Sequence, residues 1–141
     1  MAYNWNGMKR LVREKLKNEK TGHDYSHVER VLHHALKIAP ENVNRDVLIA
    51  ACLLHDISCE KDTSKTHHIT SAKKAESILL KFGFSSTMVQ EINHVIINHN
   101  RGFGEKILPE SKLSIEAQVL CDADRLDTLG AIGLIRMILF S

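Results

Sequence analysis

The sequence predicts an all-α fold, a single bundle of about six helices. Apolar residues recur mostly at spacings of three and four, the period of an amphipathic helix, and alternating runs typical of strands are nearly absent. Only two prolines and seven glycines interrupt 141 residues. The scarcity of helix breakers favours helices joined by short turns.

The expected helices lie near residues 5–19, 24–39, 43–57, 67–82, 86–99 and 113–139. Pro40 stops the second helix and Gly83 closes the fourth, while Ser85 or Ser86 caps the fifth. Residues 101–112 carry two glycines and a proline, which predicts a loop. Because there is no linker or repeat, we expect residues 1–141 to form one domain.

Composition argues against several classes of protein. Hydrophobic residues make up 43% and charged residues 26%, which is ordinary for a globular protein. The net charge is only +2 and the lysines are dispersed, so nucleic-acid binding has little support. No apolar run could span a membrane, and no secretory signal is apparent. Three cysteines without a CxxC spacing predict a reducing, cytoplasmic setting.

Several polar residues fall on apolar helix faces. Asp122 lies in a stripe with the apolar residues Ile115, Val119, Leu126 and Leu129. A buried carboxylate needs a partner, which is either a cation in the core or Arg125 three residues on. His55 shares an apolar face with Leu48 and Cys52, and Asp56 follows at the helix end, where the dipole disfavours an acid. A cation between His55 and Asp56 would explain both positions.

Histidines flank the second expected helix. His23, His27 and His34 group beside its apolar face, with Arg30 next to them. His99 ends the fifth helix, where a histidine can also simply be stabilised by the helix dipole. Taken together, two imidazoles and two carboxylates face inward from three helices, which predicts a divalent metal site formed by His27, His55, Asp56 and Asp122. The alternative is a plain bundle whose histidines only pack.

The same residues carry a family resemblance. The order His, His-Asp and a distant Asp, together with "TGHDYSHVERV", "LLHDI" and "EAQVLCDADRLDTLGAIGLIR", resembles the HD-domain superfamily of metal-dependent phosphohydrolases. These motifs resemble in particular a bacterial subgroup of small HD hydrolases, some of which act as nucleotide pyrophosphatases. The resemblance runs from Thr21 to the C-terminus and implies the four metal ligands just named. It also implies roles around the site for Lys61, Arg125 and Asp127, and it places His68 and His99 where binuclear members have extra histidines.

The function implied is hydrolysis of a phosphoester or phosphoanhydride in a small nucleotide by water activated on one divalent ion, either Mn, Mg, Zn, Fe, Co or Ni. The expected catalytic residues are Asp56, Lys61 and Asp127, and the expected phosphate-binding residues are His23, Arg30, His99 and Arg125. Two alternatives keep the metal: a nucleotide-binding module without turnover, and an iron oxygenase with a binuclear centre.

Family members usually continue for several more helices, whereas this chain stops at the apolar "RMILFS". We therefore expect either a C-terminally shortened form or a partner subunit over that end, with a homodimer as the simplest assembly.

Overall fold

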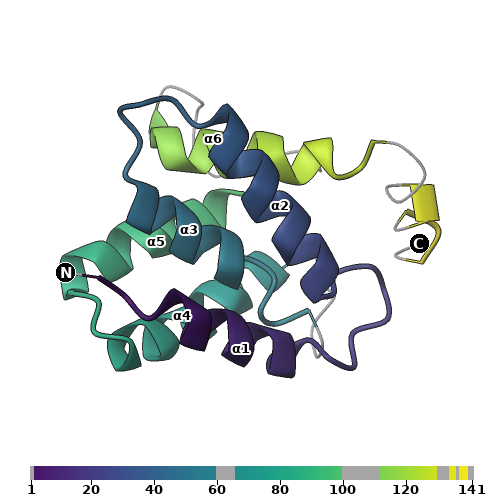
Figure 1. Cartoon of the computed structure of the whole chain (residues 1–141), viewed down its shortest axis with the longest axis horizontal. Coiled ribbons are helices and arrows are strands. Elements are labelled where there is room, and N and C mark those ends of the chain that lie inside the picture. The colour runs from purple at the N-terminus through teal and green to yellow at the C-terminus, as the bar shows by residue number, and fades with distance from the viewer. Residues whose placement is uncertain (1, 60–65, 100–111, 130–133, 136, 140–141) are drawn as a thin grey trace.

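The described part of the chain is helical and contains no strand, which confirms the all-α prediction. The structure, a computed structural model, describes residues 2–59, 66–99, 112–129, 134–135 and 137–139. Figure 1 shows the helices in order: α1 (Trp5–Lys15), α2 (Tyr25–Ile38), α3 (Arg45–Leu54), α4 (His67–Lys81), α5 (Ser86–Asn98) and α6 (Ile115–Leu126). The first five lie close to the expected positions, although α1 ends at Lys15 and α3 at Leu54, earlier than the sequence predicts. The sixth ends at Leu126, earlier than expected, although residues 134–135 and 137–139 are again helical.

Local side-chain chemistry fixes most helix starts. The side chains of five N-cap residues accept a hydrogen bond from the first turn of their helix; they are Asn4, Asp24, Asn44, Ser85 and Ser114. Ser85 is therefore the cap of α5, as the sequence suggested. Gly83 follows α4 with φ of 86°, a conformation that favours glycine and ends the helix. The expected loop at 101–112 lies almost wholly outside the described residues.

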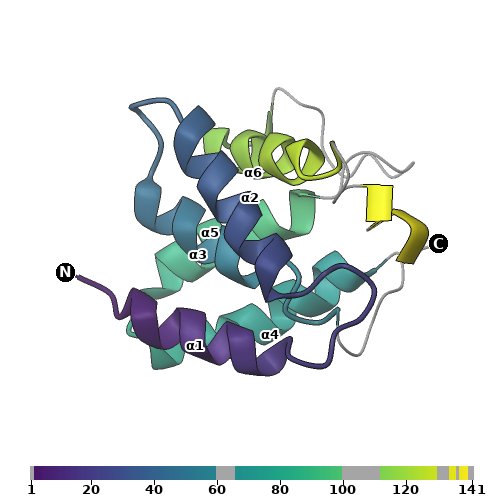
Figure 2. The ribbon, with the colours of Figure 1, turned by 45° about the vertical axis from the view of Figure 1, so that its right-hand side comes forward.

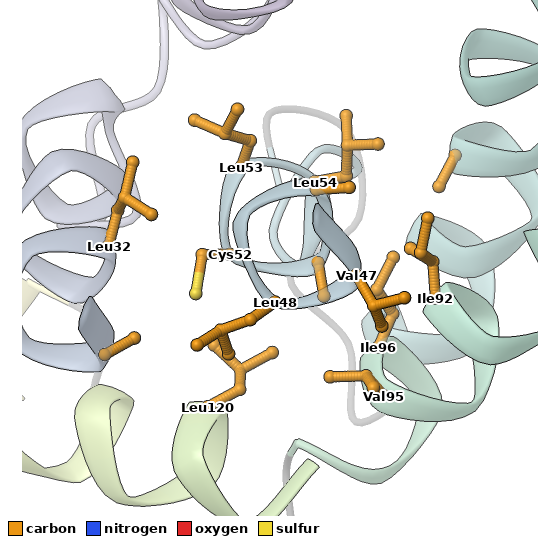
Figure 3. Close-up of a cluster of buried hydrophobic side chains, with 14 of the residues drawn as sticks. Leu32, Val47, Leu48, Cys52, Leu53, Leu54, Ile92, Val95, Ile96 and Leu120 are labelled. Carbon is orange, nitrogen blue, oxygen red and sulfur yellow. The ribbon is translucent and has the colours of Figure 1, made fainter. Parts of the chain in front are cut away.

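Helix α3 forms the centre of the fold. It contacts each of the other five helices, because its side chains are apolar nearly all round. Figure 3 shows Leu48, Leu53 and Leu54 of α3 among side chains of the surrounding helices, such as Ile92 and Leu120. In both ribbon views α1 and α4 lie along one end of the molecule and α6 along the opposite end (Figures 1 and 2). The last residues of α3 are thereby held rigidly inside the bundle.

The N-terminal arm is fixed by aromatic contacts. Tyr3 stacks on Phe84 with ring centroids 3.8 Å apart, and Trp5 meets the edge of Phe84 at 5.9 Å. The Tyr3 hydroxyl also lies 3.1 Å from the Met88 sulfur. The start of α1 is thus attached to the turn between α4 and α5. No helix among the described residues is long and apolar enough to cross a membrane.

Candidate metal centre

Asp56 follows the C-terminal end of α3 and is the centre of a group of histidines. Three of them surround its Oδ2 atom: His23 Nδ1 at 2.8 Å, His27 Nε2 at 3.2 Å and His55 Nε2 at 3.3 Å. The opposite oxygen, Oδ1, lies 3.5 Å from His67 Nε2 and 3.8 Å from His99 Nε2. Both Asp56 and His55 are almost completely buried. The end of α3 thus places one carboxylate where side chains from α2, α4 and the end of α5 meet.

Three histidines are oriented by a second contact on the far side of the ring. His55 Nδ1 donates to the Cys52 carbonyl at 2.7 Å, and His99 Nδ1 donates to the Ile96 carbonyl. His27 Nδ1 lies 2.7 Å from a carboxylate oxygen of Asp127. When Nδ1 carries the only proton of the ring, Nε2 presents its lone pair to the centre, which is the state that a bound metal requires. Metal-binding histidines are oriented in this way.

Asp124, rather than Asp122, is the aspartate of α6 that reaches this centre. An Asp124 oxygen lies 3.1 Å from His27 Nε2 and 3.9 Å from His55 Nε2. The Asp122 side chain is 64% exposed and lies 3.9 Å from Arg125, so its prediction as a metal ligand is wrong. The helix wheel failed because Leu126 and Leu129, which extended the apolar stripe, are themselves exposed. We call His27, His55, Asp56 and Asp124 the ligand cluster.

Asp127 and Arg30 support His27 instead of facing the centre. Asp127 accepts from Arg30 Nε at 2.7 Å and from Arg30 Nη2 at 3.2 Å, as well as contacting His27. Both of its oxygens are therefore engaged behind the imidazole ring. Asp127 and Arg30 are thus paired with each other and lie outside the ligand cluster, and the catalytic role expected of Asp127 and the phosphate contact expected of Arg30 stay predictions.

The remaining expected site residues divide into four groups. His23, half-buried just before α2, and His99, buried after α5, both lie beside Asp56. Arg125 is 59% exposed on the outer face of α6, next to Asp122, which argues against its expected phosphate contact. His68 is buried, but its neighbour His67 is the one that joins Asp56 and His99. Lys61 lies outside the described residues.

The charges of the cluster suit a cation. Burial opposes the charged form of His27, but hydrogen bonds with Asp124, Asp127 and Asp56 outweigh it and raise the pKa of His27 to about 10. Burial likewise opposes ionisation of Asp56 and Asp124, yet the neighbouring histidines hold the pKa of each carboxyl well below its usual range. The carboxylates are therefore charged, with protonated His27 as a positive partner in the metal-free protein, and a bound cation would take the place of that proton.

A divalent ion fits the ligand cluster. Ligand atoms of His27, His55 and Asp56 all lie within 4.8 Å of one another, and so do those of His55, His99 and Asp124. The buried Nε2 of His55 has no hydrogen-bond partner among the described residues, as expected of an atom reserved for a metal. Burial and the charge of His55 lower the pKa of His99 to about 4, so His99 is neutral and able to ligate. Two nitrogens and two oxygens are ligands for a hard to borderline metal.

The fold and the cluster define a class, a helical bundle with a His/Asp cluster that can hold a metal ion. Residues 24–129 match the HD domain family, and the chain belongs to that family. It is 33% identical over 134 residues to the YpgQ protein of Bacillus subtilis (strain 168), covering 92% of this chain and 62% of YpgQ. The chain thus spans less than two-thirds of that relative's length.

Solved structures agree with this assignment. A predicted HD superfamily hydrolase from an uncultured Thermotogales bacterium superposes with a TM-score of 0.75 at 31% identity, over 94% of this chain and 73% of that one. Bacillus subtilis YpgQ in complex with ADP superposes with a TM-score of 0.71 at 31% identity, over 96% of this chain and 64% of that one. The family prediction made from the motifs is confirmed.

Sequence reasoning missed Asp124, His67 and Cys59. Asp124 stands in the same "DADRLD" block as Asp122, and only its position relative to the buried Leu120 and Asp127 marks it as inward-facing. His67 begins α4, where either of two adjacent histidines could face the core. Cys59 gave no signal, since a buried cysteine usually acts as a small hydrophobe.

Proposed function

We propose that this protein is a metal-dependent phosphohydrolase that cleaves a phosphoester or phosphoanhydride bond of a small nucleotide. The observation that carries the proposal is the convergence of His27, His55, Asp56 and Asp124, with each imidazole held from behind. A divalent ion bound there supplies Lewis acidity, which activates water and offsets phosphoryl charge. The ADP in the YpgQ structure supports a nucleotide as the substrate.

The residues of this chain would have separate roles in metal binding, ring orientation and proton donation. Asp56 and Asp124 stay ionised and hold the cation, and Asp127 fixes the ring of His27 through Nδ1. His23 is 14% exposed and contacts Asp56, so it lies between the centre and the solvent. From there it can donate a proton to a phosphate oxygen or to the leaving group. A phosphate contact by Lys61 stays a prediction.

The test compares aspartates of one helix. Metal content per chain and phosphate or pyrophosphate release from a nucleotide panel with Mn²⁺ would be measured for the native protein and for Asp124→Ala and Asp122→Ala. Asp124→Ala should lose metal and turnover, because it removes an inward carboxylate, whereas Asp122→Ala should retain both. If only Asp122→Ala loses turnover, the metal ligand is instead Asp122, as the sequence predicted. Asp56→Ala, which removes the central carboxylate, should also be inactive.

The two alternatives are separated by the same measurements. The group formed by Asp56, His67 and His99 favours a second metal position, as an iron oxygenase would need. Two irons per chain with visible absorption and no phosphate release would support that activity. Bound metal and thermal stabilisation by nucleotide, without any product, would support a binding module.

Self-association and a cytoplasmic location also stay predictions. Leu129, Leu134 and Ile135 are 70%, 58% and 56% exposed, which is unusual for large apolar side chains near one another in sequence. Sedimentation of the native chain should give the mass of a dimer if a second copy covers them. A monomer across a wide concentration range would contradict the expected homodimer.

A further inference from the structure

Cys59 lies against the centre but outside the ligand cluster. The turn after α3 is closed by a hydrogen bond from the Cys59 backbone N–H to the Asp56 carbonyl, at 2.9 Å. That turn brings Sγ back toward Asp56, so that Cys59 Sγ, a ring nitrogen of His23 and an Asp56 oxygen all lie within 4.8 Å of one another. Neither Cys52 nor Cys121 belongs to any such group among the described residues.

The surroundings of the thiol argue against redox chemistry. Cys59 is 2% exposed, and burial together with the negative charge of Asp56 raises the pKa of its thiol far above the usual range. A protonated, inaccessible thiol is a poor nucleophile and a poor target for oxidants. A metal ion that binds sulfur can nevertheless displace the proton, because it stabilises the thiolate directly.

The three side chains match the needs of a thiophilic ion. A sulfur, an imidazole nitrogen and a carboxylate oxygen form a ligand set typical of tetrahedral Zn²⁺, in which the ligand atoms lie about 3.5 Å apart. His23 Nδ1 and Asp56 Oδ2 are closer than this, at 2.8 Å, so His23 has to move outward slightly. It can do so because its side chain reaches the solvent, whereas Asp56 and Cys59 are buried and fixed.

We propose that His23, Asp56 and Cys59 form a second cation site, one that takes a thiophilic divalent ion such as Zn²⁺ and inhibits the protein when filled. Asp56 Oδ2, the oxygen next to His23, is also the oxygen that faces His27 and His55. An ion held by the thiolate and by this oxygen therefore competes with a metal in the ligand cluster for the central carboxylate. The binding step stands on the geometry alone, and the inhibition rests on the proposed hydrolase function.

Cobalt spectroscopy tests the binding step without any turnover. Co²⁺ would be titrated into the native protein and into Cys59→Ala, with Cys121→Ala as the matched control because Cys121 is also buried. A thiolate-to-Co²⁺ charge-transfer band should appear in the native protein and in Cys121→Ala, and should be absent from Cys59→Ala. A native protein without the band, or a Cys59→Ala variant that keeps it, would overturn the proposal.

Two further measurements protect the conclusion. If Cys59→Ala does not fold, His23→Ala replaces it. Losing a ligand should weaken the Co²⁺ binding that gives the band by more than the roughly 10- to 100-fold that loss of an outer-shell partner costs. A smaller loss, or unchanged binding, would count against His23 as a ligand. Zn²⁺ should inhibit Mn²⁺-dependent phosphate release, and Cys59→Ala, compared with its own uninhibited rate, should need more Zn²⁺. A thiolate band in a protein without turnover would refute the proposed function and leave the site standing.

Discussion

Removal of the Asp127 side chain is expected to destabilise the protein by about 3 kcal/mol, at the lower end of the range for breaking a buried ion pair. Asp127→Ala takes away the acceptor of two Arg30 hydrogen bonds and the partner of His27 Nδ1. The Arg30 side chain is 29% exposed and can turn to water, which limits the cost. His27 is fully buried and cannot turn to water, so most of the loss comes from its unpaired ring nitrogen.

Urea unfolding of the chelator-treated protein near neutral pH measures this loss, with an unchanged m-value as the check that only stability has altered. Asp122→Ala is the control on the same helix, and it should cost less than about 1 kcal/mol because its contact with Arg125 is exposed. A loss in Asp127→Ala no greater than in this control would refute the supporting role of Asp127.

Acid provides a second check on the same residue. Burial opposes ionisation of Asp127, but hydrogen bonds from His27 and Arg30 lower its pKa from 3.8 to about 2. A carboxyl whose pKa is lowered by folding stabilises the native state above its unfolded pKa, and this contribution disappears as the pH falls through the folded pKa. The difference in stability between the native protein and Asp127→Ala should therefore be constant between pH 3.8 and pH 6.5, where His27 begins to titrate in the unfolded chain, and should shrink toward pH 2. If the stability difference persists at pH 2, it arises from the packing of the Asp127 side chain and not from its charge.

Three other perturbations have expected outcomes. Because folding raises the pKa of His27 from 6.5 to about 10, the metal-free protein should lose stability as the pH rises through that interval. Chemical denaturation should show that bound metal, which replaces the proton, removes this loss. Ser71→Ala removes the oxygen that accepts from the Ser58 N–H at 3.1 Å, so it should lower the free energy of unfolding by about 1–3 kcal/mol and weaken metal binding. Equal melting temperatures for the variant and the native protein would contradict this. Leu53→Ala, at a fully buried position of α3, should cost about 2–5 kcal/mol in urea unfolding without changing metal stoichiometry.

The sequence was sufficient for the fold because helix signals are local. Spacing of apolar residues and single residues such as Ser85 and Gly83 specify where helices begin and end. His27, His55 and Asp56 were also recognisable, since polar residues on buried faces need a partner. The choice between Asp122 and Asp124 was different. It depends on how α6 is rotated against α2, which is set by tertiary packing and not by the helix's own pattern.

Other contacts of the site also depend on tertiary packing. Arg30 and Asp127 are 97 residues apart, and only the pairing of α2 with α6 brings the guanidinium to the carboxylate. Without knowledge of that contact, an arginine near several histidines is interpreted as a phosphate-binding residue. Adjacent histidines at the start of α4 pose a similar problem, because helical period alone does not tell which of His67 and His68 will face Asp56.

The aromatic contacts of the N-terminal arm have a practical use. Trp5 is the only tryptophan of the chain, and its ring meets Phe84 at the turn between α4 and α5. Its fluorescence therefore reports the attachment of the arm and not the occupancy of the ligand cluster. A change in emission on adding metal or nucleotide would reveal movement transmitted along α4 or α5. A constant emission during titration, followed by a single change on unfolding, would mark the bundle as a rigid support for its centre.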